Sequence, residues 1–137
     1  MNSLVSFLVV FCGAGIGGTL RHAVNCIGRG LGIAFPWLTL VVNGTGCMLM
    51  GLIAGWFTFF GPRAGGQTLQ LFLMTGILGG YTTFSAFSLD AVLLWERRQF
   101  GLAVLYVISS ILAALLGVFA GLEYSRGTFG PGTGPHV

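Results

Sequence analysis

The stretch that decides the fold is Gly79-Gly80-Tyr81-Thr82-Thr83-Phe84-Ser85-Ala86-Phe87-Ser88, in the middle of a long apolar segment. Each glycine lowers helix propensity by about 1 kcal/mol, and the hydroxyl groups that follow can bond backbone groups that leave a helix. We therefore predict a membrane helix that is broken near the midplane, from Gly79 to Thr82. Broken membrane helices usually serve ions or solutes.

The composition of the chain predicts an integral membrane protein. Of its 137 residues, 55% are hydrophobic and 7% are charged, whereas a soluble domain has about 25% charged residues. The mean hydropathy is +0.92. Six arginines and three acids give a net charge of +3, but they lie mostly near segment ends. Nucleic-acid binding needs a clustered basic face, so this class is excluded.

Four apolar stretches are each near the length of about 20 residues that a bilayer requires. They are residues 3–24, 37–60, 68–95 and 100–124, and short connections such as Gly28-Arg29-Gly30 separate them. We expect an all-α membrane domain of four antiparallel transmembrane helices over residues 1–126. Residues 127–137, rich in Gly and Pro, are expected to be disordered. The first segment lacks the features of a removed signal peptide, so we expect it to be retained.

The arginines give little preference for one orientation in the membrane. Arg63 and Arg126 fall on one side, and the other side carries Arg21, Arg29, Arg97 and Arg98. If Arg21 belongs to the first helix, the comparison is three against two, and positive-inside sorting is nearly neutral. Such a chain could insert both ways and pair head to tail. The alternative is a single orientation, set weakly by Arg97 and Arg98.

Two sequence motifs are better explained by packing and hydrogen bonding inside a membrane than by the functions that they usually indicate. Residues 13–18 contain a GxGxxG pattern, but it stands inside an apolar run without a preceding strand. These glycines, with the GxxxG pairs that begin at Gly51, Gly76 and Gly117, predict small-residue faces for close helix packing. Asn43 begins a glycosylation pattern within a membrane segment. A buried Asn must be bonded, so it faces either another helix or a polar path.

Catalytic and covalent chemistry find no support in the sequence, so the protein is not expected to be an enzyme. The serines lack an adjacent His and acid. Cys12, Cys26 and Cys47 show neither CxxC spacing nor paired histidines, and we interpret them as small buried hydrophobic residues.

Polar and aromatic residues gather after the predicted break. Phe84 and Phe87 are three residues apart, so their rings share one helix face, and hydroxyls of Thr82, Thr83, Ser85 and Ser88 crowd the same two turns. Aromatic ring edges are electropositive and can stabilise an anion. Tyr106 and Ser110, four apart, could supply hydroxyl donors. The alternatives are ordinary core packing for the rings and helix–helix bonding for the hydroxyls.

The charged residues lie toward segment ends, as Arg21, His22, Asp90, Glu96 and Glu123 do. A proton-coupled antiporter needs a titratable group in its path, so a passive channel is favoured.

Three motifs together resemble the Fluc (CrcB) family of microbial fluoride channels. They are Gly-Gly-Thr-Leu-Arg at 17–21, Thr-Leu-Val-Val-Asn-Gly-Thr-Gly at 39–46, and Gly-Ile-Leu-Gly-Gly-Tyr-Thr-Thr-Phe-Ser-Ala-Phe-Ser at 76–88. The resemblance implies an antiparallel, dual-topology homodimer in the cell (inner) membrane. Its two pores would pass fluoride out of the cytoplasm.

The resemblance also implies roles for single residues. The pores would be lined by Asn43, Phe84, Phe87, Tyr106 and Ser110, near the hydroxyls of Thr83 and Ser85, with Arg21 at the vestibule. A structural sodium ion at the dimer centre would be held by backbone carbonyls of Gly79 and Thr82, since oxygen ligands suit a hard cation. Ala86 stands where Thr is common, and Asp90 where Glu is common.

Two other classes compete with this hypothesis. A small dual-topology multidrug or cation exporter shares the four helices and the weak charge bias, but it requires a membrane-embedded carboxylate that residues 3–20 lack. A non-transporting partner subunit would not explain the aromatic pair beside hydroxyls and a helix break.

Overall fold

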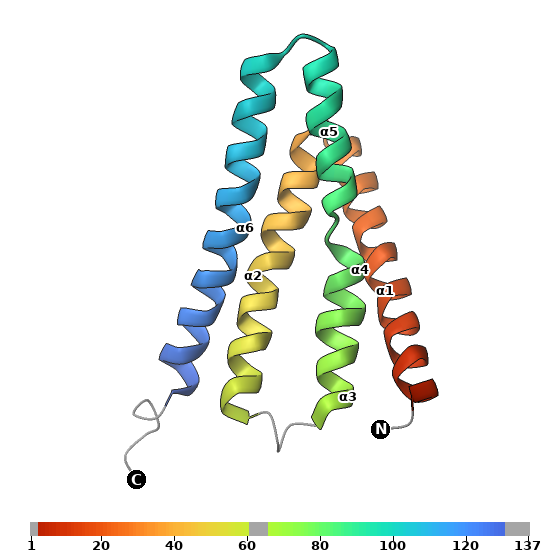
Figure 1. Cartoon of the computed structure of the whole chain (residues 1–137), viewed down its shortest axis with the longest axis vertical. Coiled ribbons are helices and arrows are strands. Elements are labelled where there is room, and N and C mark those ends of the chain that lie inside the picture. The colour runs from red at the N-terminus through yellow and green to blue at the C-terminus, as the bar shows by residue number, and fades with distance from the viewer. Residues whose placement is uncertain (1–2, 61–65, 131–137) are drawn as a thin grey trace.

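The computed structural model describes residues 3–60 and 66–130, and within these ranges the chain is helical apart from short turns. Four membrane-length spans lie side by side, and spans adjacent in sequence run in opposite directions (Figure 1). The start of α1 and the end of α6 lie at the same end of the bundle. The elements are α1 (Ser3–Gly30), α2 (Trp37–Phe60), α3 (Gly66–Gln70), the π-helix η1 (Leu71–Leu78), α4 (Gly79–Tyr81), α5 (Phe84–Glu96) and α6 (Phe100–Phe129).

All four spans are long and apolar enough to cross a membrane, as the sequence predicted. Two boundaries differ. The expected connection at residues 28–30 is the last turn of α1, where Gly28 packs against Leu38 and the Arg29 guanidinium donates to the Asn25 carbonyl at 3.2 Å. The expected limit at residue 126 falls inside α6, which continues to Phe129. The rest of the expected tail, residues 131–137, lies outside the described residues.

Glycines set the distance between the helices, which confirms the predicted small-residue faces. A Cβ on Gly13 would lie 2.8 Å from the Cα of Gly76, and the Cβ of Gly117 would lie 3.1 Å from the carbonyl oxygen of Gly44. The first pair joins α1 to η1, and the second joins α6 to α2. Close backbone approach therefore replaces the hydrophobic driving force that lipid does not supply.

The third span is interrupted close to its middle, but later in the sequence than predicted. Gly79, Gly80 and Tyr81 are still helical. Thr82 (φ −77°, ψ 158°) and Thr83 (φ −151°, ψ 116°) are extended. The prediction that the break begins at Gly79 is therefore wrong. Gly80 serves packing instead, since its Cβ would lie 2.8 Å from the Cα of Ala14.

The break also changes the neighbour of the third span. Before it, η1 and α4 pack mainly along α1, whereas after it α5 packs mainly against α6. The remaining major contact runs between α2 and α6. The chain thus forms one bundle in which the two extended residues connect the α1 side to the α6 side (Figure 1).

Candidate functional site

The break is held by the side chain of Asn43 on α2. Its Nδ2 donates to the carbonyl oxygen of Thr83 at 3.0 Å, and its Oδ1 accepts from the Thr83 backbone N–H at 2.8 Å. One amide side chain thus pairs with both backbone groups of an extended residue, as a neighbouring strand would. Asn43 is therefore bonded to the break of the third span, and the second N–H of its amide is not used in this pair.

The two threonines end one helix and begin the next. The Thr82 Oγ1 donates to the Leu78 carbonyl at 3.0 Å, in the last turn of α4. The Thr83 Oγ1 accepts from the Ala86 N–H at 3.2 Å, as an N-cap residue of α5 does. The hydroxyls of Thr83 and Ser85 lie 3.1 Å apart.

These bonds divert two donors from the backbone carbonyls of Gly79 and Thr82. In a continuous helix the N–H of residue 83 would bond the carbonyl of residue 79, and the N–H of residue 86 would bond that of residue 82. Here these N–H groups donate to side chains of Asn43 and Thr83 instead. Gly79 is exposed and Thr82 is half-buried.

Three aromatic rings form a row that starts at the break. The ring centroids of Phe84 and Phe87 are 5.4 Å apart, so the two side chains share a face as the spacing predicted. Phe87 lies 5.5 Å from Tyr106 of α6. Phe84 is 79% exposed, whereas Tyr106 is fully buried. The row therefore runs from the surface of the chain into its core.

A carboxylate that the sequence analysis did not place in the site lies at the inner end of this row. Asp90 Oδ2 accepts from the Thr39 hydroxyl at 2.6 Å and from the Tyr106 hydroxyl at 3.3 Å. The cluster joins α2, α5 and α6. Thr39 could have been found, since it stands four residues before Asn43 and so shares its helix face.

Ser110 lies one turn after Tyr106 and is also buried. Its Oγ has no hydrogen-bond partner among the described residues. A buried hydroxyl without a partner costs free energy.

Arg21 lines a polar hollow of about 190 Å³ beside the break, together with Asn25, Thr39, Val42, Thr83 and Ala86. A second hollow, of about 260 Å³, shares Asn25 and Thr39 with it and includes Arg29 and Asp90. The first hollow places Arg21 and Asn25 beside Thr83, and the second places Arg29 and Asn25 beside Asp90. Asn25 and Arg29 were missed because the sequence alone does not give the rotation of α1.

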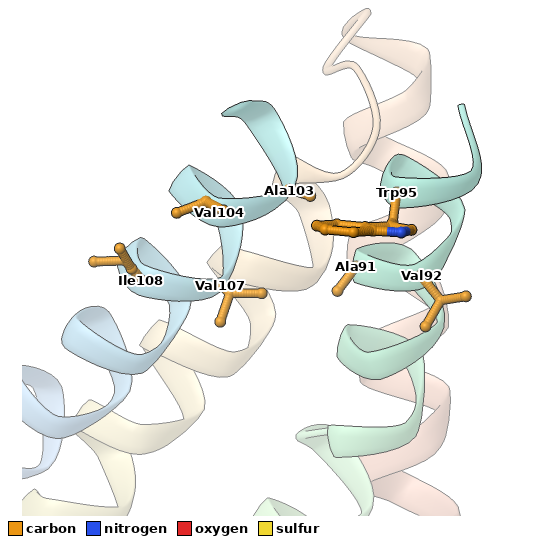
Figure 2. A pocket seen from close by; sticks show the side chains of 7 residues that line it. All are labelled: Ala91, Val92, Trp95, Ala103, Val104, Val107 and Ile108. Atoms are coloured by element: carbon orange, nitrogen blue, oxygen red, sulfur yellow. The ribbon is translucent and has the colours of Figure 1, made fainter. Parts of the chain in front are cut away.

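A larger groove of about 340 Å³ lies between α5 and α6, and its walls are apolar (Figure 2). The Trp95 ring projects from α5 toward Ala103, with the side chains of Val92, Val107 and Ile108 below it in the view. Such a surface offers no ligand for an ion and suits contact with hydrocarbon. We therefore place the candidate site at the polar hollows and the aromatic row.

Comparisons with known proteins show the family of the chain. A family model described as CrcB-like protein, Camphor Resistance (CrcB), matches residues 8–122. The "Fluoride-specific ion channel FluC" of Rhodopseudomonas palustris (strain BisB5) is 55% identical over 123 residues, which are 89% of this chain and 98% of that protein. "Fluoride-specific ion channel FluC 2" of Nitrobacter hamburgensis is 54% identical over the same shares of the two chains. The chain is therefore a multi-pass membrane protein and no enzyme, and it belongs to the CrcB (FluC) family of fluoride-specific ion channels.

Proposed function

We propose that this chain is a passive, fluoride-selective channel that exports fluoride from the cytoplasm across the cell (inner) membrane. The observation that carries the proposal is the row of rings from exposed Phe84 through Phe87 to buried Tyr106. Fluoride is small and strongly hydrated, so a selective path must replace its water with several weak donors. Ring edges, the Ser110 hydroxyl and the second N–H of Asn43 are such donors, whereas the Tyr106 hydroxyl donates to Asp90.

The path does not bind fluoride too tightly for release, because its arginine lies at one end. Arg21 lines the polar hollow beside Thr83, the rings and Ser110 carry no formal charge, and the Asp90 carboxylate bonds Tyr106 and Thr39 at the inner end of the row. A favourable entrance followed by weak sites permits both binding and release. We assign Arg21 to the vestibule, and the hydroxyls of Thr83 and Ser85 to the wall between the vestibule and the rings.

Fluoride flux from liposomes that contain the purified chain tests the function. We expect efflux of fluoride and not of chloride, measured with ion-selective electrodes. Phe84→Ile and Phe87→Ile should each lose this flux, because isoleucine has no electropositive ring edge. Phe119→Ile is the matched control, since Phe119 is an exposed ring of α6 outside the row. Equal flux of chloride, or full flux in both ring variants, would refute the proposal.

We further propose that two copies form an antiparallel, dual-topology homodimer with two pores. Non-helical backbone is tolerated in a membrane only where protein or water covers it. The carbonyls of Gly79 and Thr82 have lost their helical donors at a surface where Gly79 is exposed. A second copy that crosses at this break would cover both groups, and the weak charge bias permits its inverted insertion.

The same carbonyls support a structural sodium ion at the centre of the dimer. Carbonyl oxygens are the ligands that hard cations prefer, and the Gly79 and Thr82 oxygens of two copies would supply four. When bound, sodium would supply positive charge to these four oxygens and join the subunits. The ion would be structural and would not be transported.

Two measurements test the assembly. Replacing sodium with N-methylglucamine in detergent should shift the protein from dimer to monomer, as measured by light scattering. For orientation, Gly127→Cys in a chain with the native cysteines replaced by serine should react with an impermeant maleimide from both sides of the membrane. If the dimer persists when sodium is replaced, the proposal of a structural sodium ion is refuted. Labelling from one side alone would refute the dual topology.

A further inference from the structure

The cysteines of α1 and the carboxylate of Asp90 have no role in the function proposed so far. Cys12 and Cys26 are exposed, so their interpretation as buried hydrophobic residues is wrong, and neither lines the polar hollows. Asp90 is different, because its carboxylate is bonded to Tyr106 at the inner end of the aromatic row and also lines the hollow of about 260 Å³. It therefore stands between the row and a polar hollow.

Two hydroxyl groups from different helices donate to the same oxygen of Asp90. Thr39 of α2 donates to Oδ2 at 2.6 Å, and Tyr106 of α6 donates to it at 3.3 Å, which makes the Tyr106 bond the weaker of the two. A hydroxyl has one proton to donate, and a bond to a charged acceptor is about twice as strong as a bond between neutral groups. Both protons are therefore held by the carboxylate and are withheld from an anion in the row.

The hydroxyl of Ser110 is not withheld in this way. Ser110 is buried one turn after Tyr106, and its Oγ has no hydrogen-bond partner among the described residues. An anion beside Tyr106 would therefore meet electropositive ring edges and a single available hydroxyl. Weak donors remain at this end of the row, and two further hydroxyls are occupied.

The charge of Asp90 acts in the same direction as its hydrogen bonds. Arg29 of α1 lines the same hollow, but Asp90 forms no ion pair among the described residues. Charges interact over several ångströms where the surroundings are less polar than water. The carboxylate therefore opposes the binding of an anion beside Tyr106.

We propose that Asp90 weakens the binding of fluoride at the inner end of the aromatic row and thereby keeps its release fast. The inference rests on the proposed fluoride channel function. Conduction requires an ion to bind well enough to enter and weakly enough to leave. Asp90 is a positioning residue, because it acts by holding the hydroxyls of Thr39 and Tyr106 away from the ion and by its charge.

The concentration dependence of fluoride efflux in Asp90→Asn tests this role. Initial rates from liposomes loaded with increasing fluoride give KM and the maximal rate. Asparagine has nearly the same size but no charge, and its single oxygen is a weaker acceptor. We expect KM to fall about tenfold and the maximal rate to fall as well, because fluoride binds more tightly and leaves more slowly. A merely structural defect would lower the maximal rate without lowering KM.

Further substitutions assign the effect to the hydroxyls and to the carboxylate. Tyr106→Phe should raise KM more when it is added to Asp90→Asn than in the parent, where this hydroxyl is already bonded. Asp90→Glu keeps the carboxylate and should stay closer to the parent than Asp90→Asn does. Asp90→Ser is a second neutral variant, and it should lower KM in the same direction even if Asp90→Asn is not monodisperse on size exclusion.

Glu96→Gln is the matched control, since it removes a carboxylate from the last residue of the same helix. Glu96 is exposed, and this variant should keep the KM and the maximal rate of the parent. A parent without fluoride flux would refute the proposed function and this inference with it. If the parent passes fluoride, an unchanged or higher KM in Asp90→Asn, or a faster maximal rate, would overturn this inference alone.

Discussion

Replacing Asn43 with leucine is expected to abolish fluoride flux and to destabilise the protein. The leucine cannot bond the N–H and carbonyl of Thr83, which pair with Asn43 at 2.8 Å and 3.0 Å. Each buried backbone group left without a partner costs about 1–3 kcal/mol, and Thr83 is buried. The freed groups would seek helical partners, which would close the break and rotate Phe84 out of the row. Flux in liposomes and thermal unfolding in detergent measure the two effects.

The control for Asn43 is Thr58→Val on the same helix. The Thr58 hydroxyl bonds only the Ala54 carbonyl of its own turn among its described partners, so this variant should keep its flux and its melting temperature. Asn43→Asp separates the two bonds, because a carboxylate accepts from the Thr83 N–H but cannot donate to its carbonyl. We expect it to lose flux as well. Normal flux in Asn43→Leu would show that the break does not depend on this side chain.

Substituting valine for Gly17 should produce the largest loss of folded protein. A Cβ at this position would meet the backbone of the third span, lying 2.8 Å from the Tyr81 nitrogen and in contact with the Ile77 carbonyl oxygen. Backbone atoms cannot rotate away as a side chain can. Overpacking costs typically 1–3 kcal/mol and sometimes more, and we expect about 3 kcal/mol or above here. The yield of monodisperse protein and its thermal unfolding report the change.

Gly15 is the matched control, two residues earlier on the same helix. Its Cβ would meet nothing within 4 Å, so Gly15→Ala should change stability by no more than the helix propensity difference of about 1 kcal/mol. If Gly17→Val were as stable as Gly15→Ala, the close contact between α1 and the third span would be refuted.

Hydropathy and length were enough to predict the four spans, because crossing a bilayer imposes one requirement on every segment. They could not give the end of α1. Gly28 and Gly30 suggest a connection when they are considered alone, but Gly28 is the place where Leu38 packs. A contact between two helices decided this boundary, and local propensity did not.

The candidate site was predicted in its residue types and only partly in its geometry. The shared face of Phe84 and Phe87 follows from helical spacing, and that proximity was predictable. The position of the break was not, since it depends on a bond between Asn43 and a residue forty positions later. Asp90 was placed near a helix end by sequence, but its two hydroxyl partners come from other helices.

The change of neighbour along the third span has a consequence for variation far from the pore. The part of this span before the break packs against α1 and the part after it packs against α6, so the span links these two helices across the bundle. If a substitution shifts α1 by a fraction of an ångström, the third span would shift with it and would move Phe84 and Phe87. Permeation should therefore respond to side-chain volume at Gly13 and Gly80, although neither residue lies in the polar hollows or the aromatic row.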